Sequence, residues 1–229
     1  MDYLTLDKSN KTSRLYHKPR KLDDLIKLNN SSKSLIFSGM QLSFTPCFAD
    51  ETAEQICMRN FNSIIDFDQQ NMIVNVESGI TLYDLNKFLY KNGYIIYLTP
   101  GWPTVTIGGC IANNIHGKNP NLQGIFDDLV VEIKLLTPDN QILTLNQFKN
   151  VELFNFTKGG YGLTGAILSA KIKVQKISNS FVIEKKTVVK DIYHSYSIIR
   201  KSNSKIGSYS WHNLSDNNKF GVGINFDYY

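Results

Sequence analysis

Residues 99–118 have the composition of a segment that could bind a phosphate group. They read TPGWPTVTIGGCIANNIHGK, and no Asp or Glu occurs anywhere between Asp84 and Asp127. The adjacent Gly108 and Gly109 can expose their backbone N–H groups, and the missing carboxylates spare a bound anion from repulsion. The segment therefore predicts a cradle for a phosphate or diphosphate, with the amides of these two glycines as the donors.

The elements around this segment indicate how the fold would hold it. Thr81 and Asp84 have the spacing of a capping box for a helix over Thr81–Asn92, and Gly93 ends that helix. A strand over Ile95–Leu98 then leads into the glycine-rich residues. Along the whole chain, short strands and helices mix without regular βαβ alternation, which is typical of an α+β fold.

The pattern of elements pauses between Lys176 and Ser180. We place a domain boundary there, with one domain over residues 1–175 and the start of a second over residues 176–229. The first would contain the glycine-rich segment and a long strand over Ala166–Val174 that follows the second glycine-rich string, GGYGLTG.

The string GGYGLTG matches the dinucleotide pattern G-x-G-x-x-G by letter at Gly160, Gly162 and Gly165. That fingerprint must follow a strand and open a helix, because the helix N-terminus receives the phosphates. Here a helical piece precedes the glycines and a strand follows them. We therefore reject an NAD-binding site of this kind.

The composition is that of an ordinary globular protein. Of 229 residues 42% are apolar, and the net charge of +5 is spread rather than gathered in a stripe that nucleic acid would need. The three cysteines have no C-x-x-C spacing, which argues against a disulfide framework or a metal site. Neither a signal-peptide core nor a run of about 18 apolar residues is present. We expect a cytoplasmic protein without an integral membrane segment, and peripheral contact with a membrane stays open.

Two blocks carry a resemblance to a known family. Residues Pro100–Asn119 fit the pattern P-G-x-x-x-V-T-[VI]-G-G-x-[IV]-A-x-x-I-H-G-K-N, and residues 152–167 fit E-L-F-x-x-x-x-G-G-x-G-L-T-G-x-[IV]. The chain resembles FAD-dependent oxidoreductases of the vanillyl-alcohol oxidase / PCMH class, nearest to the decaprenylphosphoryl-ribose 2-oxidase-like sugar and aldonolactone oxidases. The resemblance implies a PCMH-type FAD-binding domain of two α/β subdomains, followed by an incomplete substrate (cap) domain.

A third block departs from the family pattern. Where relatives have R-G-x-G-R-S-Y-G-D, this chain has SGMQLSFT over Ser38–Thr45. Gly39 and Ser43 match, but Gln41 and Leu42 replace a glycine and an arginine, and we expect weaker or altered cofactor binding. The loop also lacks the His that covalently flavinylated relatives use there, so the resemblance implies noncovalent FAD. The residues that it assigns to the FAD site are Ser38, Gly39, Ser43, Phe44, Gly101, Thr106, Ile107, Gly108, Gly109, Asn113, Ile115, His116 and Ile167.

The resemblance also implies a reaction. His116 would hold or move a proton beside the flavin, and Lys118 would meet a substrate phosphate. The secondary hydroxyl of a sugar would be oxidised to a ketone with hydride transfer to the flavin. The expected substrate is a phosphorylated sugar of the polyprenyl-phosphate type or a lactone sugar, in cell-wall or polysaccharide biosynthesis.

Relatives continue into a complete substrate domain, whereas the last pattern in this chain is a strand that reaches Phe226. The chain is expected to be a fragment, one half of a split enzyme or a degenerate flavoprotein. Expected partners are a second chain that completes the substrate domain or an NAD-dependent reductase, and no nucleic acid. The alternative to catalysis is a flavin-binding module that works by association.

Overall fold

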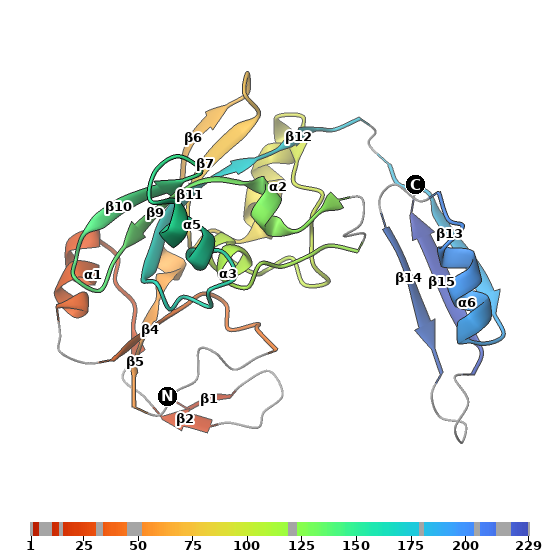
Figure 1. The fold of residues 1–229 in the computed structure, drawn as a ribbon, viewed down its shortest axis with the longest axis horizontal. Coiled ribbons are helices and arrows are strands. Elements are labelled where there is room, and N and C mark those ends of the chain that lie inside the picture. The colour runs from red at the N-terminus through yellow and green to blue at the C-terminus, as the bar shows by residue number, and fades with distance from the viewer. Residues whose placement is uncertain are drawn as a thin grey trace. The chain divides into compact units, whose positions relative to one another are not determined.

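The structure is a computed structural model that describes residues 2–4, 11–13, 16–30, 34–44, 52–118, 123–178, 181–203, 207–213 and 221–228. The chain folds into two compact units (Figure 1). The first unit comprises Met1–Ile96, Trp102–Ile115 and Phe126–Lys176, and the second comprises Tyr97–Gly101, His116–Ile125 and Ile177–Tyr229. The division into a cofactor domain and a substrate domain after residue 175 stays a prediction.

An antiparallel five-stranded sheet forms the centre of the first unit. The strand order is β10-β9-β11-β7-β6. The strands are β6 (Ile64–Asp68), β7 (Ile73–Glu77), β9 (Val130–Leu136), β10 (Ile142–Asn146) and β11 (Ala166–Lys173). Alternate residues such as Val74, Val76, Ile133 and Leu135 are fully buried, because successive side chains of a strand point to opposite faces.

Helix α2 (Leu82–Lys91) begins with the predicted capping box. The Thr81 hydroxyl accepts a hydrogen bond from the Asp84 amide at 3.0 Å and donates one to the Asp84 carboxylate at 2.6 Å. Gly93 follows the helix with φ +82°, a conformation that glycine adopts at little cost. The predicted helix and both of its end signals are therefore confirmed.

A second, parallel sheet of the first unit holds the loop that follows β4. Its strand order is β3-β5-β4, with β3 (Tyr16–His17), β4 (Leu35–Ser38) and β5 (Glu54–Cys57). Helix α1 (Leu22–Asn29) contributes Leu25 to a core cluster with Ile56, Phe61 and Leu136, so the two sheets share buried contacts.

The shorter elements of the first unit are β1 (Asp2–Leu4), β2 (Lys11–Ser13), η1 (Met58–Asn60), β8 (Tyr94–Ile95), α3 (Ile107–Ala112), η2 (Phe126–Leu129), α5 (Val151–Thr157) and β12 (Gln175–Lys176). Strand β8 pairs with β12 and is shorter than the strand predicted over residues 95–98. No helix within the described ranges is long and apolar enough to cross a membrane.

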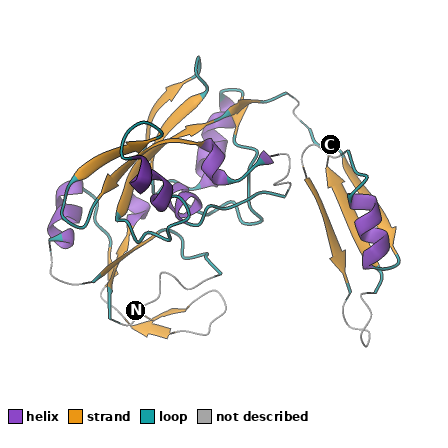
Figure 2. Ribbon diagram, viewed as in Figure 1, coloured by secondary structure: helices purple, strands orange, loops and turns teal. Residues whose placement is uncertain are grey.

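In the described part of the second unit, an antiparallel sheet of three strands packs against a helix (Figure 2). The strand order is β13-β15-β14, with β13 (Glu184–Val189), β14 (Gly207–His212), β15 (Gly223–Tyr228) and helix α6 (Ile192–Ile199). Asn225 contacts Ser195 of α6, so Ile224 and Phe226 on either side of it point to the opposite face. Helices and short strands mix in both units, which confirms the α+β prediction.

Candidate functional site

Helix α3 carries the Gly-Gly pair and begins under a side-chain cap. The Thr106 hydroxyl accepts a hydrogen bond from the Gly109 amide at 3.3 Å. The Gly108 amide donates to the Ser78 carbonyl at 2.8 Å. The Gly108 amide is thus engaged by a peptide carbonyl, and the prediction that it donates to the phosphate is wrong. The Gly109 amide faces only the capping hydroxyl, and its role as a phosphate donor stays a prediction.

These glycines allow the backbone to come close instead. A Cβ atom on Gly108 would lie 3.0 Å from the Ser78 Cβ and 3.2 Å from the Ser78 carbonyl oxygen. A Cβ atom on Gly39 would overlap the Thr106 side chain. The end of β7, the start of α3 and the loop after β4 therefore meet at three predicted residues: Gly39, Thr106 and Gly108.

The loop of residues 38–44, called the β4 loop below, is also tied to the other end of α3. The Ser43 hydroxyl donates to the Asn113 Oδ1 at 3.1 Å, and the Asn113 Nδ2 donates to the Gly109 carbonyl at 2.9 Å. Ser38, at the end of β4, is buried, whereas Phe44 is 88% exposed. The structure thus brings the β4 loop and the glycine-rich segment of residues 99–118 together through Ser43 and Asn113.

Two buried donors in this neighbourhood have no hydrogen-bond partner among the residues that the structure describes. They are the Nε2 of Gln41 in the β4 loop and the hydroxyl of Ser78, which is 2% exposed. A buried polar group without a partner costs free energy, so each calls for an explanation such as a ligand. No pattern in the sequence singled out Ser78, which directly follows strand β7.

The GGYGLTG string closes the C-terminal end of α3. The Gly159 amide donates to the Ile111 carbonyl and the Tyr161 amide to the Ala112 carbonyl, each at 2.9 Å. The last carbonyls of a helix need such partners. The GGYGLTG string therefore acts on α3 itself, in addition to leading into β11.

The remaining predicted residues of the first unit lie deeper. Ile107 is fully buried, and its amide donates to the Ile80 carbonyl at 2.9 Å. Ile167 of β11 is 6% exposed and pairs with Leu135 of β9. The Ile115 carbonyl accepts from the Phe126 amide at 2.9 Å. Their role at a cofactor stays a prediction.

His116 and Lys118 belong to the second unit, and both are exposed. The His116 Nδ1 lies 2.9 Å from the Gly117 carbonyl oxygen. A carbonyl can only accept, so Nδ1 carries the proton and Nε2 of the neutral ring can take one up. Gly101 also belongs to this unit, and a Cβ atom there would meet nothing within 4 Å.

Lys118 contacts a residue that the sequence did not single out. Its Nζ lies 3.9 Å from the centre of the Tyr209 ring, within the range of a cation–π interaction. Tyr209 stacks on Phe226 at 4.9 Å and its hydroxyl lies 3.2 Å from that of Tyr228. The hydrogen bond with Tyr209, partial burial and the bond to Glu184 raise the pKa of Tyr228. Ninety-one positions separate Lys118 from Tyr209, so no local pattern could have linked them.

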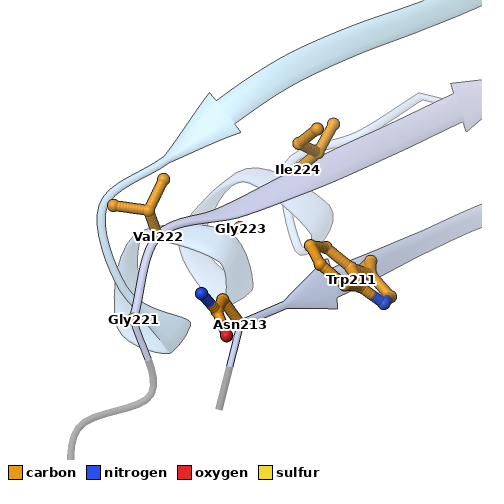
Figure 3. A pocket seen from close by; sticks show the side chains of 6 residues that line it. All are labelled: Trp211, Asn213, Gly221, Val222, Gly223 and Ile224. Atoms are coloured by element: carbon orange, nitrogen blue, oxygen red, sulfur yellow. The ribbon is translucent and has the colours of Figure 1, made fainter. Parts of the chain in front are cut away.

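A shallow hollow lies at the end of the β14–β15 pair (Figure 3). Its lining consists of Trp211, Asn213, Gly221, Val222, Gly223 and Ile224. None of these side chains can exchange a proton near neutral pH, so the hollow offers contact surface and no acid–base chemistry.

Comparisons with known proteins agree with this geometry. Residues 17–146 match the family model described as FAD binding domain. The chain is 35% identical over 129 residues to the decaprenylphosphoryl-β-D-ribose oxidase of Mycolicibacterium smegmatis, which is 56% of this chain and 28% of the relative. It is 25% identical over 169 residues to the D-arabinono-1,4-lactone oxidase of Candida glabrata, which is 69% of this chain and 31% of the relative.

The fold matches a solved structure of alkyldihydroxyacetonephosphate synthase with a TM-score of 0.78 at 17% identity, over 93% of this chain and 46% of that one. The chain thus spans less than half the length of that protein. The predicted PCMH-type FAD-binding fold and the FAD cofactor are confirmed. The family model matches more than half of the residues of this chain, so the chain belongs to the FAD binding domain family.

Proposed function

We propose that this chain takes part in the FAD-dependent oxidation of a secondary hydroxyl of a sugar, either a phosphorylated sugar or a sugar lactone. Two relatives named above are oxidases of a phosphoryl-linked ribose and of an arabinono-lactone, which supports this substrate class. The observation that carries the proposal is the His116 side chain, whose Nδ1 is engaged by the Gly117 carbonyl while Nε2 stays available as a base.

The residues of the first unit fit FAD. The β4 loop and α3 approach closely, two buried donors there have no partner in the described part of the chain, and no carboxylate occurs between Asp84 and Asp127. A diphosphate needs such donors and tolerates no neighbouring negative charge. Ser38, Gly39, Ser43, Thr106, Gly109 and Asn113 are the residues that we propose around it.

In the reaction, bound FAD would supply the acceptor for the hydride that leaves the sugar carbon. Nε2 of His116 would take the hydroxyl proton as the C–O bond becomes a carbonyl. Lys118 would hold the substrate phosphate by charge, and its position over the Tyr209 ring supports this role because the ring orients the ammonium group.

Anaerobic stopped-flow mixing of the FAD-loaded chain with phosphorylated sugars and sugar lactones tests the proposal. We expect a substrate to bleach the visible flavin absorbance, and His116→Ala to slow bleaching about 100-fold or more without loss of bound flavin. His194→Ala, on α6 and outside this site, is the control and should bleach at the parent rate. Bleaching of His116→Ala at the parent rate would remove this residue from the mechanism.

A second candidate function is a flavin-binding module that acts by association or as one half of a split enzyme. The short coverage of relatives and the altered β4 loop favour it. In that case the partner is a second chain that completes the substrate domain, or an NAD-dependent reductase. Flavin that stays oxidised with every sugar, and is bleached only after a second chain is added, would support this candidate. Peripheral contact with a membrane surface stays a prediction from the sequence.

A further inference from the structure

Gln41 has a backbone conformation that is strained for any residue with a side chain. Its φ is +59°, in the left-handed region where glycine is favoured and other residues are strained by about 1 kcal/mol or more. The family pattern that the chain resembles has a glycine at this position, and a glycine would adopt this φ without strain. A strained residue persists only where surrounding contacts or a function hold it.

The Gln41 side chain is itself unusual. Its Nε2 is buried and has no hydrogen-bond partner in the described ranges. An amide nitrogen carries two N–H donors and no acceptor, so it suits an oxygen atom with negative charge. The neighbouring Leu42 has no donor and stands where the family pattern has an arginine.

Two contacts fix where Gln41 lies. On one side of it in the chain, Gly39 packs against Thr106 at the start of α3. On the other side, Ser43 donates to Asn113 directly after α3. Gln41 therefore lies where the β4 loop passes alongside α3, next to the residues that we place around the diphosphate.

We infer that the side-chain amide of Gln41 donates a hydrogen bond to the diphosphate of FAD. This role explains why the strained left-handed backbone is tolerated at Gln41. A glycine would relieve the strain but has no side-chain donor for the diphosphate. The inference rests on the FAD cofactor of the family and does not depend on the proposed sugar substrate.

Binding measurements on the apo chain test the inference without any turnover. ADP has the diphosphate and no flavin ring, and riboflavin has the ring and no phosphate. Gln41→Met keeps the length and the strained backbone but loses the donor, and we expect it to weaken FAD and ADP binding about tenfold by calorimetric titration. Riboflavin affinity should not change.

Gln41→Gly removes the side-chain donor and also relieves the backbone strain, so its effects on binding and on stability should differ. It should raise or preserve the melting temperature of the apo chain, since glycine adopts this φ freely, and still weaken ADP binding about tenfold. Met72→Gly is the matched control, because Met72 also has a left-handed φ, +55°, in the turn before β7. It should leave the affinity for FAD and ADP at the parent value.

Unchanged ADP affinity in Gln41→Met, or in a folded Gln41→Gly, would overturn the inference. An equal loss of riboflavin and ADP affinity would also overturn it, since that result means a collapsed loop rather than a lost phosphate donor. Neither result bears on the proposed sugar oxidation, which the stopped-flow experiment tests separately.

Discussion

The sheets of the two units differ in the side chains that they bury. In the first unit, Val76, Leu85 and Ile133 are among many fully buried apolar residues. In the second unit, the sheet face toward α6 contains Asn225 and Asp227, which are 0% and 2% exposed. The central sheet of the first unit is thus packed in an apolar core, whereas the sheet face toward α6 in the second unit also buries polar side chains that are hydrogen-bonded to Ser195 and Ser202.

The aromatic residues of strands β14 and β15 lie on the other face of this sheet. Tyr209 and Phe226 stack there, next to Trp211, which is 63% exposed. Such an arrangement leaves the best contact surface available to a ligand or to another part of a protein. The difference teaches that the first unit is built for stability, whereas the second is built to present a surface.

The largest effect on stability is expected from a substitution in the tightly packed backbone of the first unit. A Cβ atom on Gly79 would overlap the Met58 carbonyl and lie 2.7 Å from the Phe61 carbonyl oxygen. Backbone cannot move aside cheaply, so Gly79→Ala should lower the free energy of unfolding by about 3 kcal/mol. Thermal denaturation followed by circular dichroism measures this effect.

Gly101→Ala is the control for that variant, since a Cβ atom there would meet nothing within 4 Å. We expect a change of less than about 0.5 kcal/mol. Equal stability of the two variants would contradict the close packing assigned to the end of β7.

A smaller loss of stability is expected when the hydrogen bonds between Asn225 and Ser195 in the second unit are removed. The Ser195 hydroxyl donates to the Asn225 Oδ1 at 2.6 Å, and the Asn225 Nδ2 donates to the Ser195 carbonyl at 3.2 Å. Asn225→Ala leaves these buried groups without partners and should cost about 2 kcal/mol. Hydrogen exchange should show faster opening of β15 amides and unchanged protection in β9.

The paired change Ser195→Ala with Asn225→Leu removes the hydroxyl donor and the amide together and fills the space with apolar atoms. Much of the lost protection should return, because apolar replacement of both partners is close to neutral. Protection in the paired variant as low as in Asn225→Ala would mean that the polar contact is not what holds α6 to the sheet.

Local chemistry made part of the structure predictable. The Thr81–Asp84 capping box and the stop at Gly93 depend on residues close in sequence, and both appear as expected. The strand β5 was missed, because as the middle strand of a parallel sheet it buries three of its four residues and shows no alternation.

The candidate site was predictable in its residues and not in its contacts. The glycine blocks identified Gly108, but its amide is taken up by the carbonyl of Ser78, which the chain brings back from 30 positions away. The contact between Lys118 and Tyr209 likewise depends on tertiary structure. The replacement of a glycine by Gln41 led us to expect altered cofactor binding, but the left-handed φ of Gln41 could be seen only in the structure.

The smallest changes in stability are expected when one ion pair of each unit is removed. Glu132 of β9 lies 2.9 Å from Lys171 of β11. Partial burial opposes its ionisation, but hydrogen bonds from Lys171 and Asn146 outweigh this and hold the pKa of Glu132 below its ordinary value of 4.5. A lowered folded-state pKa stabilises the fold above the unfolded pKa, and the contribution is lost as the pH falls through the folded value.

Glu132→Gln should therefore lower stability by about 0.5 kcal/mol at neutral pH, a figure that allows for solvent screening of the exposed lysine. Denaturant titrations from pH 7 down into acid should show this difference from the parent shrinking as the parent carboxylate is protonated. Glu184 lies 3.0 Å from Lys186 in the second unit, its side chain is 38% exposed, and hydrogen bonds from Lys186 and Tyr228 lower its pKa as well. Because water screens this exposed pair, Glu184→Gln should lower stability at neutral pH by less than Glu132→Gln does, and this smaller difference should likewise shrink in acid. A loss as large as that of Glu132→Gln would mean that this sheet face is shielded from solvent, and that the contrast between the two units is smaller than their side chains indicate.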